Sequence, residues 1–176
     1  MAVQELAFRR LAAGDLPLLQ AWLAAEPALR WYAQGRAPTM EGMESKYLPR
    51  IRGEVPVSCW ILLRAGRPAG YFQAYLARDF PHDFHNQPAV HDPGAAALDY
   101  LLAPEVVGQG LAAPALRVFL QEVVFSWPDV RICYADPDPA NLASVRALRR
   151  AGFSSVPLPA PLPNVLLLAC PRPPQS

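Results

Sequence analysis

Two glycines, Gly108 and Gly110, stand where an apolar stretch ends and an amphipathic run begins, in the sequence LLAPEVVGQGLAAPAL. This order is typical of a strand, a tight turn and a helix. The first turn of a helix leaves backbone N–H groups without partners, and glycines let an anion approach them closely. The segment therefore predicts either a backbone anion cradle or a plain strand-to-helix turn. Neither the Walker A motif nor GxGxxG fits, because no Lys-Ser/Thr pair and no third glycine follow.

The histidines and cysteines form no metal-binding pattern. They are three histidines in one proline-rich segment and three cysteines far apart in the chain: His82, His85, His91, Cys59, Cys133 and Cys170. The HxxH at 82–85 could place two imidazoles on one helical face, but flanking prolines and the lack of a third ligand favour a loop. We expect no bound metal and no disulfide framework, and a reduced, cytoplasmic environment.

The composition favours one folded domain. The chain has 176 residues, of which 52% are hydrophobic and 18% charged, which is enough apolar material for a core. Sixteen basic against fifteen acidic residues give a net charge of +1, which argues against nucleic acid as a partner. No apolar run approaches the roughly 18 residues that cross a bilayer, so we expect no membrane partner. We expect one domain over 1–170 and a frayed, proline-rich tail over 171–176.

Hydrophobic periodicity and turn residues predict alternating strands and helices. Strands are expected at 3–11, 57–64, 69–77, 95–103, 130–136, 153–156 and 164–170. Helices are expected after Asp15, which would cap the first, and at 39–52, 110–125 and 141–152. Loops are expected before the second helix, around Trp31 and Tyr32, and on the surface at 79–94. The pattern predicts an α/β fold with a mixed central sheet of about six to seven strands flanked by about four helices.

Two segments resemble motifs of the GNAT acetyltransferases. Leu102, Pro104 and Glu105, followed by Gly110 and Ala112, resemble the strand LxVxPEy and the turn R/Q-x-x-G-x-G/A, although Val107 occupies the first, basic or amide position. NLASVRALRRAGF at 141–153 resembles the family's NxxAxxLYEKxGF. The order and spacing of the two motifs identify the domain as a member of this superfamily. The resemblance implies the GNAT fold, with acetyl-CoA as co-substrate.

Residues 6–156 resemble the aminoglycoside 6'-N-acetyltransferases more closely. The similar segments are YLPRI at 47–51, GRPAGYFQAYLA at 66–77, HDPGAAALDYLLA at 91–103 and ADPDPANLASVRALRRAGF at 135–153. The resemblance implies direct attack of a primary amine on the thioester, 6'-N-acetylation of an aminoglycoside-type amino sugar and hence antibiotic resistance. Siderophore-type N-acyltransferases and other small-amine GNAT enzymes are alternatives, as is a non-catalytic acyl-CoA-binding module. We expect a monomer or homodimer.

The resemblance also implies roles for individual residues. Asp99 would be the catalytic base or amine-binding carboxylate, since an ammonium must lose a proton before it attacks a thioester; the alternative is a structural hydrogen-bond acceptor. Asp136, Asp83, Trp31 and Tyr32 would contact the substrate, with helix entry at Asp136 and core packing by the aromatic pair as alternatives. The expected acetyl-CoA contacts are Leu101 and Leu102 for pantetheine, Gly108, Gln109, Gly110, Leu111 and Ala112 for pyrophosphate, with Val107 as a further cofactor contact. Asn141 would contact the pantetheine arm; the alternative is that an exposed Asn at a helix start has no function.

Two departures from the family pattern bear on chemistry. Leu148 replaces the tyrosine that the family is taken to use to protonate the leaving thiolate. A thiolate with a pKa of about 8.5 leaves readily near neutrality, so water could serve as the acid, or none could be needed. The segment HNQPAVHDPG carries a single acid where the family is densely acidic. We therefore expect aminoglycosides to bind weakly, because fewer carboxylates attract the polycation.

Overall fold

The computed structural model describes residues 5–84, 91–158 and 164–174. In these residues a seven-stranded sheet has the order β1-β2-β3-β4-β5-β7-β6. Its strands are β1 (Leu6–Arg10), β2 (Ser58–Arg64), β3 (Arg67–Leu76), β4 (Ala95–Leu102), β5 (Ile132–Ala135), β6 (Ser154–Ser155) and β7 (Leu168–Pro171). β4 pairs with β5 in parallel, whereas β1 with β2, β5 with β7 and β6 with β7 are antiparallel. The predicted mixed α/β sheet is confirmed.

Five α-helices lie in the described residues: α1 (Leu16–Leu23), α2 (Ala28–Trp31), α3 (Met40–Ile51), α4 (Ala112–Glu122) and α5 (Leu142–Arg150). The loop predicted around Trp31 is wrong, because Trp31 is the last residue of α2 and Tyr32 is its C-cap. A helix of four residues makes little more than one turn, which is too short for a periodic apolar pattern. Only Ala28 of this helix is buried.

The loop predicted at 79–94 is partly helical. Short 3₁₀ helices span Ala77–Asp79 and Pro81–Phe84, and residues 85–90 lie outside the described part of the chain. Phe84 is 2% exposed, and its ring centroid lies 6.4 Å from that of Tyr75. The prediction overlooked that an aromatic residue in a turn-rich segment can bury its ring and so fix the segment to the core.

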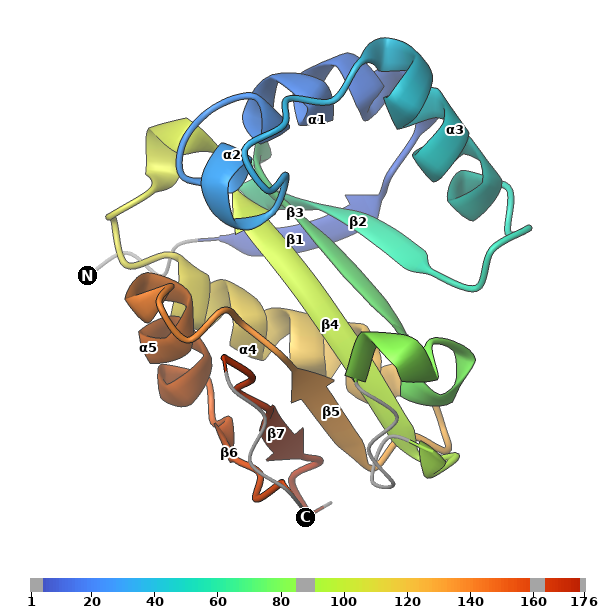
Figure 1. The fold of residues 1–176 in the computed structure, drawn as a ribbon, viewed down its shortest axis with the longest axis vertical. Coiled ribbons are helices and arrows are strands. Elements are labelled where there is room, and N and C mark those ends of the chain that lie inside the picture. Colours follow the sequence, from blue (N-terminus) through green and yellow to red (C-terminus); the bar gives the residue numbers. More distant parts are fainter. Residues whose placement is uncertain (1–4, 85–90, 159–163, 175–176) are drawn as a thin grey trace. The chain divides into compact units, whose positions relative to one another are not determined.

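The chain forms two compact units, Met1–Gln73 with Asp99–Leu111, and Ala74–Leu98 with Ala112–Ser176. In the first unit α1 packs against α3, and α1, α2 and α3 lie on one side of β1 and β2 (Figure 1). In the second unit α4 contacts α5. The single domain over 1–170 and the frayed tail over 171–176 stay predictions; Pro171 ends β7, and the backbone N–H of Arg172 donates to Arg131 O at 2.7 Å.

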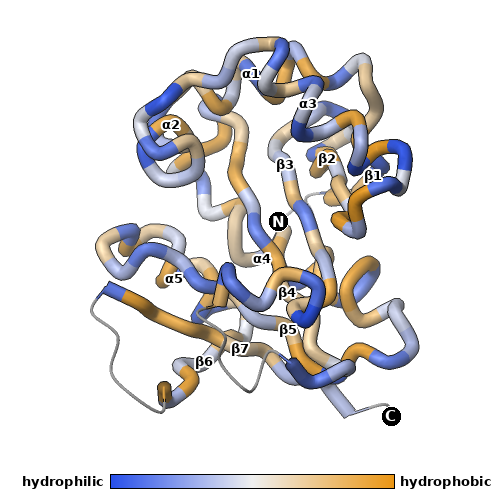
Figure 2. Tube along the Cα trace, turned by 45° about the vertical axis from the view of Figure 1, so that its right-hand side comes forward, coloured by the Kyte–Doolittle hydropathy of each residue, from blue (hydrophilic) through white to orange (hydrophobic). Residues whose placement is uncertain are grey.

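The second unit is built on apolar strands and one helical stripe. Ala95 to Leu98 of β4, Cys133 to Ala135 of β5 and Leu168 to Cys170 of β7 are buried, and Figure 2 shows β7 as largely hydrophobic. The helix predicted at 110–125 is observed as α4, in which Leu116, Phe119 and Leu120 are at most 4% exposed. Pro114 lies in the first turn of α4, where backbone N–H groups have no carbonyl acceptor within the helix. The N–H that proline lacks therefore costs the helix no hydrogen bond.

In the first unit, β3 and the end of β4 approach closely. Ala103 N donates to Ala69 O at 2.9 Å, and a Cβ at Gly70 would lie 2.7 Å from Leu101 O, so only glycine fits at this position. Side chains alternate along β3, since successive residues of a strand point to opposite faces. Phe72 stacks on Tyr100 of β4 with centroids 5.3 Å apart, whereas Tyr71 and Gln73 point to the opposite face. That face carries the polar residues described below.

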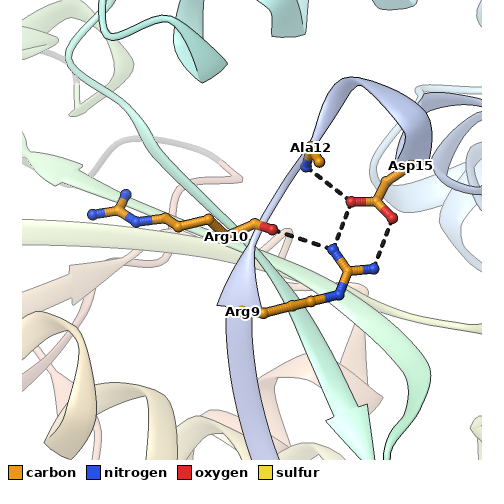
Figure 3. Close-up of polar contacts among 4 residues, drawn as sticks. All are labelled: Arg9, Arg10, Ala12 and Asp15. Atoms are coloured by element: carbon orange, nitrogen blue, oxygen red, sulfur yellow. Dashed lines mark hydrogen bonds and ion pairs between the residues drawn. The ribbon is translucent and has the colours of Figure 1, made fainter.

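Asp15 does not cap α1 with its side chain, so this prediction is wrong (Figure 3). Its backbone is already helical, at the end of a 3₁₀ turn, whereas a capping residue needs an extended backbone. The carboxylate instead accepts from both Nη1 and Nη2 of Arg9 at 2.7 Å, and from Ala12 N at 2.9 Å. The Arg9 hydrogen bonds are the first cause that lowers the pKa of Asp15. The pair ties β1 to the entry of α1.

We predict that Asp15→Asn lowers the free energy of unfolding at pH 7 by about 0.5–1 kcal/mol, because Arg9 is partly exposed and water screens the pair. A carboxyl whose pKa is lower in the folded state stabilises above its unfolded pKa, about 3.9, and loses that contribution as the pH falls through the folded pKa. Urea unfolding of both proteins at pH 7 and near pH 3 measures the difference. A difference that does not shrink at low pH would contradict the assignment.

Candidate functional site

Asp99 lies on β4 beside Gln73 of β3, and the two side chains are hydrogen bonded. Gln73 Nε2 donates to Asp99 Oδ2 at 2.7 Å. Gln73 Oε1 accepts from Arg50 Nη1 of α3 at 2.8 Å and lies 2.8 Å from the hydroxyl of Tyr71. Gln73 is 8% exposed, whereas Asp99 is half-buried. The first unit therefore presents a carboxylate beside a buried amide whose oxygen and nitrogen both have hydrogen-bond partners.

A second contact extends this network to Cys59 of β2. The Tyr71 hydroxyl lies 3.1 Å from Cys59 Sγ, in addition to its contact with Gln73. The phenol carries one hydrogen, so it donates to one of the two partners at a time. Burial is the first cause that raises the pKa of Tyr71 well above its usual value, and burial also raises the pKa of the Cys59 thiol. Both groups are therefore neutral near pH 7.

Tyrosine rings surround the network on the helical side. Tyr71 meets Tyr47 of α3 edge to face at 5.6 Å between centroids, and Tyr32 at 6.4 Å. Lys46 Nζ lies 5.8 Å from the centroid of the Tyr32 ring. Tyr47 is 1% exposed, and its hydroxyl has no hydrogen-bond partner among the described residues. The structure thus places the predicted residue Tyr32 in the same cluster as Asp99.

Trp31, the other half of the predicted aromatic pair, has a different neighbour. The guanidinium carbon of Arg30 lies 4.5 Å from the centroid of the Trp31 ring, which is half-buried. A cation over an aromatic face is held by the ring quadrupole. Simple core packing therefore does not describe Trp31, and one face of its ring is covered by Arg30.

The glycine turn after β4 has the predicted strand-to-turn-to-helix form. A 3₁₀ turn (Pro104–Val106) follows β4, and Gly108 and Gly110 have φ angles of 80° and 73°, a region that glycine favours. A Cβ at either glycine would meet nothing within 4 Å, so backbone conformation rather than crowding requires glycine. Leu101 and Leu111 are buried, Leu102 is half-buried, and Val107 is 41% exposed.

Side chains in the turn hold one another in place. Gln109 Nε2 donates to Glu105 O at 2.8 Å, and Gln109 Oε1 accepts from Arg64 Nη1 at 2.6 Å. Arg64 is the last residue of β2 and brings a positive charge to the glycine turn. The turn therefore offers glycine flexibility, backbone N–H groups and a nearby cation, although Val107 supplies no charge.

The second unit holds the other predicted residues. Asp136 is exposed immediately after β5, and Asp138 Oδ1 accepts from Ala140 N at 2.8 Å in the turn before α5. Asn141 is the N-cap of α5, and its Oδ1 accepts from Ser144 N at 3.2 Å. Asn141 therefore caps α5, and its side-chain oxygen Oδ1 already has a hydrogen-bond donor. Ala112 begins α4, and Asp83 is exposed on the 3₁₀ helix Pro81–Phe84.

Leu148, at the position of the family's tyrosine, is a core residue of α5. Its side chain is 1% exposed and packs in the core. Within the described residues, no group of three His, Cys, Asp or Glu side chains could hold a metal ion. In the same part of the chain, no helix is long and apolar enough to span a membrane.

The sequence analysis did not identify Gln73, Arg50, Tyr71 or Cys59 as site residues. A signal was present in β3, where Gln73 interrupts an apolar strand between Phe72 and Ala74. A buried amide needs hydrogen-bond partners, so a lone glutamine in a buried strand indicates a polar network. The sequence does not show which distant residues complete it.

The chain is similar to known acetyltransferases in sequence and in fold. Residues 12–158 match the family model described as an acetyltransferase (GNAT) domain. The chain is 32% identical over 147 residues to the aminoglycoside N(6')-acetyltransferase type 1 of Klebsiella pneumoniae, covering 82% of this chain and 72% of that protein. A crystal structure of the aminoglycoside acetyltransferase AAC(6')-Ib with coenzyme A and kanamycin has a TM-score of 0.80 and 29% identity, covering 96% of this chain and 95% of that one.

A more distant structure shares the fold alone. Spermidine N-acetyltransferase from Vibrio cholerae, in complex with coenzyme A and spermine, has a TM-score of 0.73 at 14% identity. It covers 94% of this chain and 95% of its own.

We predict that Asn141→Ala lowers the free energy of unfolding by about 1 kcal/mol, because the first turn of α5 loses its cap. Asn141→Ser keeps a capping oxygen and is expected to unfold within about 0.5 kcal/mol of the wild type. Urea denaturation at pH 7 measures both. Equal destabilisation by the two substitutions would show that the Oδ1 contact with Ser144 N contributes little.

Proposed function

The chain belongs to the GNAT acetyltransferase family, together with the aminoglycoside N(6')-acetyltransferases, and on that basis we propose that it acetylates the 6'-amine of an aminoglycoside-type amino sugar with acetyl-CoA. The observation that carries the proposal is the Asp99 carboxylate, which Gln73 holds beside a cluster of tyrosines. A half-buried carboxylate bounded by aromatic rings suits an ammonium group attached to a sugar ring.

Asp99 would act on the substrate amine. An amino sugar reaches the site mainly as an ammonium ion, which the carboxylate attracts. Asp99 accepts one proton from it, directly or through a water molecule, and the freed lone pair attacks the thioester carbonyl. The new C–N bond gives a tetrahedral intermediate, whose nitrogen loses a second proton to solvent, and collapse of the intermediate breaks the C–S bond. The products are the N-acetylated sugar and the thiolate of coenzyme A, which takes up a proton from solvent.

The glycine turn would bind the pyrophosphate of acetyl-CoA. In the proposal, the backbone N–H groups of Gly108, Gly110 and Leu111, with that of Ala112 at the start of α4, donate to the phosphate oxygens. The N–H groups of Val107 and Gln109 already donate to Pro104 O and Val106 O, and these bonds shape the turn. The open space beside Gly108 and Gly110 fits this role, since no side chain occupies it. Leu101 and Leu102 would pair with the pantetheine arm. Asn141 would reach that arm with its Nδ2 group, because its Oδ1 already caps α5.

The leaving group needs no acid from the position of Leu148. The Leu148 side chain is a buried hydrocarbon, so it has no proton to donate to the thiolate of coenzyme A. The thiolate, with a pKa of about 8.5, is a tolerable leaving group near neutral pH. Proximity of the amine to the thioester therefore supplies most of the rate enhancement in this proposal.

The acceptor specificity would rest on few charges. We propose Asp136 and Asp83 as further carboxylates for the substrate, and Tyr32 and Trp31 as ring contacts. Lys46 beside Tyr32 and Arg30 on Trp31 place positive charge at these rings. Both cations oppose binding of a polycation. A kanamycin-like substrate is therefore expected to have a high KM, which rises with salt as the attraction to carboxylates is screened.

We predict that Asp99→Asn lowers kcat/KM for kanamycin by about 100-fold or more, since the amide neither accepts the proton nor attracts the ammonium. Thiol release from acetyl-CoA measures the rate, and NMR of the product locates the acetyl group. Asp15→Asn is the matched control, because it removes a carboxylate of the same unit that binds Arg9, and it is expected to retain wild-type turnover at 25 °C.

Two results would overturn the proposal. Undiminished turnover by the Asp99→Asn protein would remove Asp99 from the reaction. Inert aminoglycosides combined with efficient turnover of a hydroxylated diamine or a peptide amine would keep the acetyltransferase but replace the acceptor, in favour of a siderophore-type or other small-amine enzyme.

A further inference from the structure

We propose that Gln73 is a positioning residue that orients the Asp99 carboxylate for reaction, and that Arg50 fixes the direction in which the Gln73 amide points. The proposal rests on the proposed role of Asp99. It assigns a task in the reaction to two residues, one on β3 and one on α3, that need not touch the substrate.

The chemistry of arginine determines the orientation of the amide. A guanidinium has donors and no acceptor, so the Gln73 atom 2.8 Å from Arg50 Nη1 must be the carbonyl oxygen Oε1. The atom 2.7 Å from Asp99 Oδ2 is therefore the NH2 group. If the amide were reversed, Arg50 would face NH2 and Asp99 would face a carbonyl oxygen, which would place two donors together and two acceptors together. Each contact thus enforces the other.

This arrangement favours an oriented, ionised Asp99. The NH2 group of Gln73 donates to Oδ2, and a hydrogen bond to the charged form of a carboxyl stabilises that form. The neutral Gln73 amide connects the Arg50 guanidinium to the Asp99 carboxylate through two successive hydrogen bonds. The first, of 2.8 Å, joins Arg50 to Gln73, and the second, of 2.7 Å, joins Gln73 to Asp99. A direct bidentate Arg–Asp contact would occupy both carboxylate oxygens. The amide instead orients the carboxylate through one of its two oxygens.

Burial restricts movement of the Gln73 amide between Arg50 and Asp99. Gln73 is 8% exposed, and its oxygen contacts both Arg50 and the hydroxyl of Tyr71, so rotation of the amide would break two contacts at once. Arg50 is itself positioned against the Tyr47 ring, with 5.6 Å between the guanidinium carbon and the ring centroid. The sheet contributes the remaining constraint, because the close approach at Gly70 fixes β3 against the end of β4.

Other titratable groups of the first unit share this environment and must be considered in any pH dependence. They come from α2, α3, β2 and β3: Tyr32, Lys46, Tyr47, Arg50, Cys59 and Tyr71. Burial raises the pKa of the tyrosines and of Cys59, so these groups stay neutral across the acidic limb of a pH profile. A shift of that limb in a Gln73 variant therefore reports on Asp99.

The experiment compares Gln73→Leu and Gln73→Glu with the wild type by the pH dependence of kcat/KM for the best amine acceptor. Leucine removes the donor to Asp99, which raises the pKa of the carboxyl, and we expect a loss of about 10- to 100-fold at neutral pH. Because the base must be deprotonated, the acidic limb moves to higher pH by about one unit. Glutamate keeps the contact with Arg50 but places a carboxylate oxygen beside Asp99. Because like charges disfavour the ionised form of Asp99, the acidic limb of the Gln73→Glu protein moves to still higher pH.

Gln20→Leu is the matched control for loss of a partly buried amide. Gln20 lies on α1 in the same unit, and its Nε2 donates to Pro38 O at 2.9 Å. This variant is expected to change stability without moving the acidic limb. Arg50→Lys, which keeps a charged donor for Gln73 Oε1, is expected to stay closer to the wild-type profile than Arg50→Met.

A carboxyl ¹³C NMR titration of Asp99 provides a readout that needs no substrate. A higher Asp99 pKa in the Gln73→Leu protein than in the wild type would support the proposal even if every aminoglycoside proved inert. An unchanged Asp99 pKa, or an acidic limb that stays in place while Gln73→Leu and Gln20→Leu lose stability alike, would overturn it. In that case, wild-type acetylation of kanamycin would still support the proposed function.

Discussion

The hydrogen bond between the Gln73 amide and the Asp99 carboxylate is the contact on which the rest of the candidate site depends. Its direction follows from Arg50, which can only donate and therefore requires the amide oxygen on its side. The sheet supplies the proximity, through the close pairing of β3 with the end of β4 at Gly70. Helix α3 supplies both Arg50 and the Tyr47 ring on which it lies. Side-chain chemistry and strand packing thus specify the same geometry.

This geometry separates two tasks that an acetyl transfer requires. In the reaction that we propose, the Asp99 carboxylate would bind and deprotonate the amine, whereas the glycine turn would bind the pyrophosphate through its backbone N–H groups. The positive φ angles of Gly108 and Gly110 allow that turn, and Arg64 adds charge through Gln109 where the family's usual basic or amide residue is a valine. The buried Leu148 shows that the chain dispenses with an acid at the position of the family's tyrosine. The reaction we propose depends on orientation and on a good leaving group.

The sequence predicted those features that depend on local pattern. Alternating and helical periods predicted the long strands and helices, and the glycine pair correctly predicted a tight turn between a strand and a helix. The helix α2 was missed, because four residues are too few to show a period. Asp15 was assigned a capping role because its position suits one, whereas the bidentate contact with Arg9 depends on the tertiary path of the chain. Gln73 and Arg50 are 23 residues apart, so their contact also required the structure.

The most direct test of the account is a crystal structure of the protein with coenzyme A and kanamycin. We expect the 6'-amine nitrogen within hydrogen-bond distance of Asp99, the Gln73 NH2 group still donating to Oδ2, and the pyrophosphate on the backbone N–H groups that follow Val107. An amine bound at Asp136 or Asp83 and remote from Asp99, or an Asp99 carboxylate that has left Gln73 in the complex, would contradict the central claim.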